Sequence, residues 1–316
     1  LQTCVVLSGT ESQWLDRASM DPFDKVVLKL FSEPWVGTAP APLAPDAWFA
    51  ETAKQALATL GRDKLVVALG SFAVEWTSGT PLPSTLPYAK AMEQIAAHKA
   101  ELRYSEKTSG SFATYQDQLG RTHKIWLQDA ASLINQRKML ADLGIDRIAL
   151  WSLGKEDPGV WTVLRSPDLA PDALSGALAV VQFDNYIDYS GEGAFLRVAA
   201  RQSPGIRQMR IDAESGRVTA QHYDLMPRPY RMERYGKPEG RQVVLSFDDG
   251  PDSVYTAEIL DTLKETQTPA TFFVTGKSVM DAPEMLERII AEGHVIGAHT
   301  FSHPRMDLVS KTRMDL

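Results

Sequence analysis

Hydrophobic residues along the first half of the chain alternate between short continuous runs and stretches with helical spacing. The continuous runs lie at residues 4–7, 25–31, 64–70, 123–127 and 147–154. Runs of this kind are typical of strands that are covered on both faces. The stretches at 46–61 and 131–144 have helical spacing and end on glycines. This pattern predicts parallel β/α units, about half of a β/α barrel, over residues 1–164.

The pattern changes between residues 165 and 240. Proline, glycine and aspartate are frequent there, and short alternating pieces such as GAFLRVAA replace the long helices. Alternation over a few residues is typical of half-buried strands. We therefore predict a small β-rich connector over residues 165–240, with the MPRPY stretch at 226–230 as its extended exit.

The last segment, residues 241–316, returns to a β-α-β-α-β pattern. RQVVLSF, ATFFVTG and HVIGAHT have the composition of strands, and the stretches between them have helical spacing, the second opening on Pro283 and closing on Gly293. The carboxyl ends of parallel strands collect functional groups at one edge. We therefore expect Asp248, Asp249 and His299 at a common edge of an α/β domain.

His299 and His303 are four residues apart in HVIGAHTFSHP. Two imidazoles at this spacing can converge on one ion, and Pro304 favours a loop over a helix at His303. One carboxylate from Asp248 or Asp249 would complete a set of three protein ligands. Such a set leaves positions open for water, whereas a structural zinc site is closed by four ligands. The motif therefore predicts a catalytic metal site.

The two adjacent aspartates are expected to have different tasks, because consecutive side chains at a strand end point in different directions. One can bind the metal while the other accepts a proton from water, whose pKa a metal lowers toward about 7. The predicted reaction class is metal-assisted hydrolysis. Two simpler interpretations remain: DDGP is a common turn sequence, and HxxxH also occurs as two surface histidines. His98, His123, His222 and His294 are assigned to no site.

Composition and charge narrow the function classes. The chain has 316 residues and a net charge of -7, which argues against a nucleic-acid partner. Its one cysteine, Cys4, allows neither an internal disulfide nor a cysteine-based zinc site. No stretch reaches the roughly 18 apolar residues of a membrane helix. The chain begins with Leu1 and ends on VSKTRMDL, so we interpret it as an internal piece of a longer protein whose targeting segments lie elsewhere.

The motifs SFDDGPD, ATFFVTG and EGHVIGAHTFSHP resemble the first half of a polysaccharide deacetylase of the NodB-homology type, carbohydrate esterase family four. The resemblance covers residues 241–316, and Ser246 stands where the family has threonine. It implies a deformed β/α barrel that removes N-acetyl groups from an N-acetylhexosamine polysaccharide and releases acetate. By position, Asp248 matches the general base, and Asp249, His299 and His303 match the ligands of a divalent ion, most often zinc.

The family's later motifs supply an arginine that orients the base and a histidine that acts as general acid. The resemblance places these residues beyond Leu316, so we expect residues 1–316 alone to have little or no activity.

The N-terminal half resembles the second half of a family-eighteen glycoside hydrolase, a chitinase-like barrel. FDKVVLKLFSEPW, DKLVVALGSFAVEW and IALWSLGKEDPGVW match three of its strands, and Trp151 matches a tryptophan that stacks on sugar. Phe31 and Ser32 stand where the family has Tyr-Asp, and its acidic D-x-x-D-x-D-x-E motif is absent. Glycoside hydrolysis requires a carboxylic acid, so both a glycosidase and a glycan-holding module stay open.

The order of barrel, connector and deacetylase resembles bacterial envelope proteins in which a membrane-embedded family-two glycosyltransferase follows. On this resemblance the partner is an N-acetylglucosamine-containing glycan, and contact with a membrane is made only by segments outside the chain. Two other functions stay open: a non-catalytic glycan-binding protein, and a different metal hydrolase such as a phosphoesterase.

Overall fold

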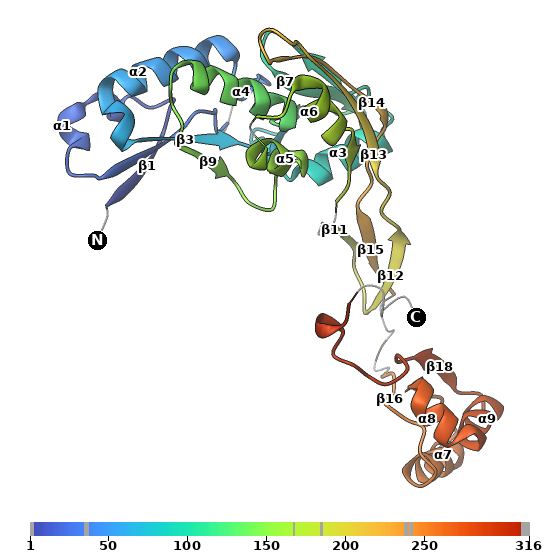
Figure 1. Cartoon of the computed structure of the whole chain (residues 1–316). Helices are drawn as coiled ribbons and strands as arrows, with labels where there is room; N and C mark the ends of the chain where they lie inside the picture. Colours follow the sequence, from blue (N-terminus) through green and yellow to red (C-terminus); the bar gives the residue numbers. More distant parts are fainter. Residues whose placement is uncertain are drawn as a thin grey trace. The chain divides into compact units, whose positions relative to one another are not determined.

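The computed structural model describes residues 3–34, 38–166, 168–183, 186–236, 240 and 243–310. The chain forms two compact units, Leu1–Tyr235 and Gly236–Leu316 (Figure 1). Both units combine sheets with helices, which confirms a mixed α/β fold. No helix within the described residues is long and apolar enough to cross a membrane.

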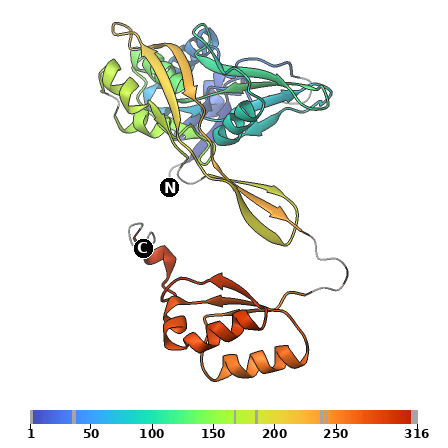
Figure 2. The ribbon, with the colours of Figure 1, turned by 90° about the vertical axis from the view of Figure 1, so that its right-hand side faces the viewer.

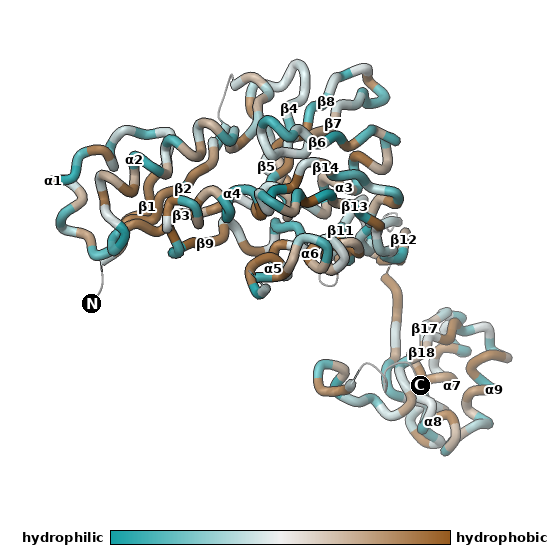
Figure 3. The backbone as a smooth tube through the Cα atoms, turned by 45° about the horizontal axis from the view of Figure 1, so that its top comes forward, coloured by the Kyte–Doolittle hydropathy of each residue, from teal (hydrophilic) through white to brown (hydrophobic). Residues whose placement is uncertain are grey.

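A parallel sheet of four strands, in the order β1-β2-β3-β9, forms one part of the first unit. The strands are β1 (Cys4–Ser8), β2 (Lys25–Lys29), β3 (Leu65–Gly70) and β9 (Ile148–Trp151). Three of them fall within predicted apolar runs, and β1 extends one residue beyond the run at 4–7. Val26, Leu28 and Val67 are fully buried, and Figure 3 shows the hydrophobic colouring along β1 and β9. A parallel sheet needs this apolar surface because helices cover it.

Two long helices provide that cover. Helix α2 (Asp46–Lys64) packs against β2 and β3, and α4 (Ala130–Asp142) packs against β3. The glycines that we predicted as helix ends have left-handed φ angles of 75° at Gly61 and 70° at Gly144, where other residues are strained. Gly61 interrupts α2 rather than ending it, because the chain regains a helical turn up to Lys64. Two short helices, η1 (Gln13–Leu15) and α1 (Arg17–Met20), follow β1.

The run at 123–127 is not a strand of the parallel sheet, and this part of the prediction is wrong. It lies in β8, inside a five-stranded antiparallel sheet of order β5-β4-β8-β7-β6. The strands are β4 (Ala73–Thr77), β5 (Ser84–Leu86), β6 (Arg103–Ser105), β7 (Gly110–Gln116) and β8 (Thr122–Leu127). The connection from β7 to β8 is a tight turn through Gly120, too short for a parallel crossover. Helix α3 (Tyr88–Ala97) packs on this sheet through Met92 and Ile95.

The segment predicted as a β-rich connector is grouped with the first unit up to Tyr235. It starts at the end of α5 (Gly159–Arg165) and contains α6 (Pro171–Ala177). Strands β10 (Val180–Val181), β13 (Gly205–Ile211) and β14 (Val218–Leu225) form one antiparallel sheet. Strands β11 (Ile187–Gly191), β12 (Phe195–Ala200) and β15 (Tyr230–Tyr235) form a mixed sheet, in which β15 pairs parallel with β11 and antiparallel with β12. The stretch at 226–230 leads into β15 and is not the exit of the segment.

A buried ion pair fixes β13 against the helices. Arg207 Nη1 donates to Asp157 Oδ2 at 2.5 Å, and both side chains are fully buried. The same carboxylate accepts hydrogen bonds from the backbone N–H groups of Ala130 and Gly159, at 3.0 and 2.8 Å. Because these groups lie at the starts of α4 and α5, one carboxylate ties two helices and a strand together.

The second unit is a parallel sheet of three strands in the order β16-β17-β18. The strands are β16 (Ser246–Asp248), β17 (Thr271–Val274) and β18 (Val295–Ala298). Its helices are α7 (Tyr255–Glu265), α8 (Gly276–Asp281), α9 (Pro283–Ala291) and the short η2 (Met306–Leu308).

The predicted β-α-β-α-β order is confirmed, but α8 was not predicted. Leu260, Leu263, Phe272 and Ile289 form the core, and Figure 2 shows the longer helices gathered on one side of the strands. Residues 241–242 of the first predicted strand, and 311–316, lie outside the described residues.

We expect Asp157→Ala to lower the free energy of unfolding of the first unit by about 3–5 kcal/mol, because it leaves the Arg207 guanidinium buried without a counter-charge. Urea unfolding followed by tryptophan fluorescence measures this, since all seven tryptophans lie at or before Trp161. Glu101→Ala is the control, because the Glu101–Arg103 pair is exposed and its loss should cost less than about 1 kcal/mol. Equal effects of the two substitutions would contradict the role given to Asp157.

Candidate metal centre

Asp248 is the last residue of β16 and lies on the face of the sheet opposite the core. Its neighbour Phe247 packs against the core and stacks on Phe272, with ring centroids 5.1 Å apart. Because side chains alternate along a strand, Asp248 is directed to the other face, and its side chain is exposed. No described residue donates a hydrogen bond to its carboxylate.

Asp249 leaves the strand in a left-handed conformation with φ of 72°, which aspartate tolerates better than most residues. Its backbone N–H donates to the carbonyl of Phe273 at 3.0 Å, and its carbonyl accepts from Ser278 Oγ at 2.9 Å. The residue is therefore held by β17 on one side and by α8 on the other. This turn of the backbone is what separates the directions of the two adjacent aspartates.

His299 and His303 lie on the loop that follows β18, as Pro304 predicted. The N–H of His299 donates to the carbonyl of Val274 at 2.9 Å, which extends the pairing of β17 with β18 by one residue. The N–H of His303 donates to Thr300 Oγ1 at 3.0 Å. Both Thr300 and His303 have positive φ, of 64° and 49°, so the loop curls back on itself.

The first turn of α8 holds this loop in place. The N–H groups of Gly276 and Lys277 donate to the carbonyls of Thr300 and Phe301, at 3.0 and 2.8 Å. These are N–H groups that a helix start leaves free for other acceptors. The sequence reasoning missed this role of α8, although the T-x-x-S spacing of Thr275 and Ser278 was a signal, since Thr275 caps the helix by accepting from the Ser278 N–H.

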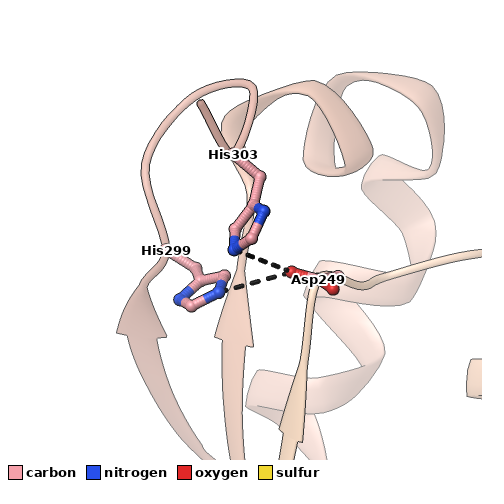
Figure 4. A group of neighbouring side chains, drawn as sticks. All are labelled: Asp249, His299 and His303. Carbon is pink, nitrogen blue, oxygen red and sulfur yellow. Dashed lines mark ion pairs between the residues drawn. The ribbon is translucent and has the colours of Figure 1, made fainter. Parts of the chain in front are cut away.

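Three side chains converge at the carboxyl edge of the sheet (Figure 4). Asp249 Oδ1 lies 3.3 Å from His299 Nε2 and 3.7 Å from His303 Nε2, and the ligand atoms all lie within 4.8 Å of one another. Ligands that bind zinc tetrahedrally at about 2.1 Å are separated by about 3.4 Å. The donor set and its spacing therefore fit a divalent metal ion. Asp248 is not a member of this group.

Water can reach the group. The side chains of Asp249 and His303 are 66% and 60% exposed, and that of His299 is 30% exposed. The two imidazole rings are stacked with centroids 4.7 Å apart. Three protein ligands with an open side are the arrangement of catalytic rather than structural zinc sites.

Asp252, in the same SFDDGPD motif, anchors the start of α7. Its Oδ1 accepts hydrogen bonds from the backbone N–H groups of Val254 and Tyr255 at 2.9 and 2.6 Å. Burial acts to raise the pKa of Asp252, but the hydrogen bonds from Tyr255 and Val254 outweigh it and hold the pKa below its ordinary value. This carboxylate was not among the predicted functional residues, although an aspartate ahead of a helical stretch is a start signal.

Two of the other histidines, His294 and His123, make structural contacts. His294 Nδ1 accepts from the N–H of Ala270 at 3.2 Å, at the amino end of the sheet and away from the candidate centre. His123 lies between two carboxylates, with Nδ1 2.9 Å from Glu75 and Nε2 3.3 Å from Asp117. Neither residue belongs to a group of three side chains that could hold a metal among the described residues.

Trp151, the predicted sugar-stacking residue, is the last residue of β9 in the first unit. The residue is 39% exposed, and Lys29 Nζ lies over its ring at 5.1 Å from the centroid. It lines a small cavity of about 180 Å³ together with Glu33, Phe72 and Lys155. One ring face is therefore already covered by a cation.

Comparison with known proteins shows sequence similarity in the C-terminal region of the chain. Residues 235–315 match the sequence model of the family described as Polysaccharide deacetylase. A chitooligosaccharide deacetylase from Sinorhizobium fredii is 47% identical over 74 residues, covering 23% of this chain and 34% of that protein. A peptidoglycan-N-acetylglucosamine deacetylase from Bacillus cereus is 48% identical over 77 residues, covering 24% and 27% of the two proteins.

Among solved structures, the spore cortex-lytic enzyme SleL of Bacillus megaterium aligns with a TM-score of 0.46 and 21% identity, covering 52% of this chain and 41% of that one. The chain spans about a third of the length of the two curated relatives it matches. Residues 235–315 are therefore similar in sequence to polysaccharide deacetylases.

We expect Asp252→Ala to destabilise the start of α7 by about 1 kcal/mol, because two backbone N–H groups lose their acceptor. Hydrogen–deuterium exchange of α7 measures the change. The folded-state pKa of Asp252 is lowered, so its contribution is complete above the ordinary aspartate pKa of about 3.9 and is lost as pH falls through the lower folded value. The difference from wild type should therefore stay constant from about pH 5 to 8.

Asp281→Ala is the matched control, because Asp281 is exposed and has no partner among the described residues. If both substitutions accelerate exchange of α7 equally, the anchoring role of Asp252 is wrong.

Proposed function

We propose that the protein is a metal-dependent N-deacetylase that releases acetate from an N-acetylhexosamine polysaccharide. The observation that carries the proposal is the convergence of Asp249, His299 and His303 at the carboxyl edge of the sheet, inside the region that matches the deacetylase family. The relatives named as chitooligosaccharide and peptidoglycan deacetylases support the substrate class.

Asp249, His299 and His303 would hold a divalent ion, and we propose zinc because two imidazoles and one carboxylate suit it. Such an ion lowers the pKa of water and polarises a carbonyl oxygen when bound. The loop contacts from α8 keep the two imidazoles on the same side of Asp249.

Asp248 would act as the general base. It is exposed, accepts no hydrogen bond from a described residue, and is directed away from the core, so its carboxylate is free to accept a proton. In the reaction one water molecule is consumed: its oxygen forms a bond to the acetyl carbon, and one proton passes to Asp248. The C–N bond then breaks, the nitrogen gains a proton to become an amine, and acetate leaves.

We also propose that residues 1–164 are the second half of a chitinase-like barrel, residues 165–240 a β-rich connector, and residues 241–316 the first half of a deformed deacetylase barrel. The parallel order β1-β2-β3-β9 and the exposed Trp151 at the end of β9 support the first part. Trp151 would stack on a sugar ring through the face that Lys29 leaves open. A downstream family-two glycosyltransferase and a location in the bacterial envelope belong to the same proposal and rest on the order of the domains.

A phosphoesterase would use the same metal ligands, and a glycan-binding protein would need no base. Acetate release from chitooligosaccharides by the full-length protein, abolished by a chelator and restored by zinc, separates the deacetylase from both. Activity that survives removal of the metal, or hydrolysis of a phosphate ester with no acetate release, would contradict the proposal.

We expect His303→Ala to weaken zinc binding by more than about 100-fold, which exceeds what the loss of an outer-shell partner costs. Isothermal titration calorimetry of the metal-free protein measures this. His222→Ala is the control, because the side chain of His222 is 72% exposed and lies in the first unit. Zinc affinity that is unchanged in His303→Ala would remove this residue from the ligand set.

We expect Asp248→Asn to keep zinc affinity and to lower the turnover number by about 10²–10⁴, the contribution of a general base. Calorimetry and acetate release by the full-length protein measure the two quantities. Asp281→Asn should change neither. Loss of zinc binding with Asp248→Asn would mean that the two aspartates have the reverse of the roles proposed.

A further inference from the structure

A cavity of about 720 Å³ lies in the first unit between α3, α5 and the segment that follows β10. Its size is within the range of small-molecule sites. All its lining residues belong to the first unit, whereas the candidate metal centre belongs to the second. The side chains that give it chemical character are Lys155, Glu156, Trp161, Arg165, Phe183 and Tyr186.

Two cations on the cavity wall form no ion pair with any described residue. Among the described residues, no carboxylate lies within ion-pair distance of Lys155 or Arg165, although the chain as a whole has a net charge of -7. Of the described residues that line the cavity, Glu156 alone is acidic. These described residues therefore give the lining an excess of positive charge on an otherwise acidic protein, which favours an anionic ligand.

Glu156 holds the aromatic ring of Trp161 in place by a hydrogen bond. Its Oε1 accepts a hydrogen bond from Trp161 Nε1 at 3.1 Å. Its Oε2 is buried and accepts no hydrogen bond from the described residues. The indole of Trp161 is thus held as part of the wall, beside Phe183 and Tyr186. Aromatic walls of this kind suit the apolar face of a sugar ring.

Backbone N–H groups, which phosphate sites commonly use, are already occupied near the cavity. At the start of α5, the N–H of Gly159 donates to Asp157 Oδ1 at 2.8 Å and that of Val160 to the Asp157 carbonyl at 3.0 Å. A phosphate would have to be bound by side chains without backbone N–H groups, that is by Lys155 and Arg165 with neutral donors such as Thr162. A carboxylate needs fewer donors and is the better match.

We propose that this cavity binds a sugar residue that carries a carboxylate, with Lys155 and Arg165 as counter-charges and Trp161 against the ring. The inference goes beyond the proposed deacetylation and does not require the metal centre. It assigns the first unit a preference for acidic over neutral sugars.

Isothermal titration calorimetry of the metal-free protein, with the chelator dialysed away, tests this with two sugars. N-acetylmuramic acid and N-acetylglucosamine share the same ring and differ by one lactyl ether that carries a carboxylate. We expect the acidic sugar to bind at least about tenfold more tightly, a difference of about 1.4 kcal/mol, and its affinity to fall as salt is added. Equal affinities, or no binding of either sugar, would overturn the proposal.

Two substitutions locate the site. Lys155 also lines the small cavity at Trp151, whereas Arg165 lines only the larger of the two. We expect Arg165→Met and Lys155→Met each to weaken binding of N-acetylmuramic acid by about tenfold, and the exposed control Lys54→Met to leave it unchanged. Circular dichroism checks that each variant is folded.

Two outcomes would overturn the assignment. Loss of binding with Lys155→Met but not with Arg165→Met would place the carboxylate in the cavity at Trp151 instead. Competition by inorganic phosphate as effective as that by N-acetylmuramic acid would show a general anion site with no preference for a sugar.

Discussion

The parallel register of β16, β17 and β18 is the constraint on which the candidate metal centre depends. Asp248 pairs with Phe273, and Phe273 with Gly297, so Asp249 and His299 leave the sheet at nearly the same level. They come from strands that are separated only by β17. Residues 50 positions apart in the sequence are therefore neighbours because of backbone pairing, before any side-chain interaction contributes.

The loop after β18 supplies the third side chain, and here local interactions matter more than the sheet. Thr300 and His303 both have positive φ, a conformation that costs free energy unless neighbouring groups stabilise it. The N–H groups at the start of α8 and the hydroxyl of Thr300 provide that stabilisation. The cluster therefore depends on a six-residue helix, α8, that contributes no ligand of its own.

The candidate site could be predicted from the sequence because its residues lie next to strong strand patterns. The ends of the strand sequences SFD and VIGA indicated which edge of the sheet holds the site. The spacing of His299 and His303 indicated that their imidazoles can bind the same ion. What could not be predicted was the environment: the left-handed turn at Asp249 and the contacts made by α8 depend on backbone torsion, which hydrophobic periodicity does not report. The run at 123–127 misled for a related reason, since an apolar strand has the same pattern in a parallel and in a covered antiparallel sheet. The buried ion pair Asp157–Arg207 could not be predicted from the sequence either, because its partners are 50 residues apart and belong to no motif.

The central claim is that Asp249, and not Asp248, shares one ion with His299 and His303. A crystal of the zinc-loaded protein measured at the zinc absorption edge tests it most directly. The account predicts an anomalous peak about 2.1 Å from Asp249 Oδ1 and from one nitrogen of each imidazole, with the Asp248 carboxylate outside the coordination shell. A peak bound by Asp248 in place of Asp249, or no peak at this edge of the sheet, would contradict it.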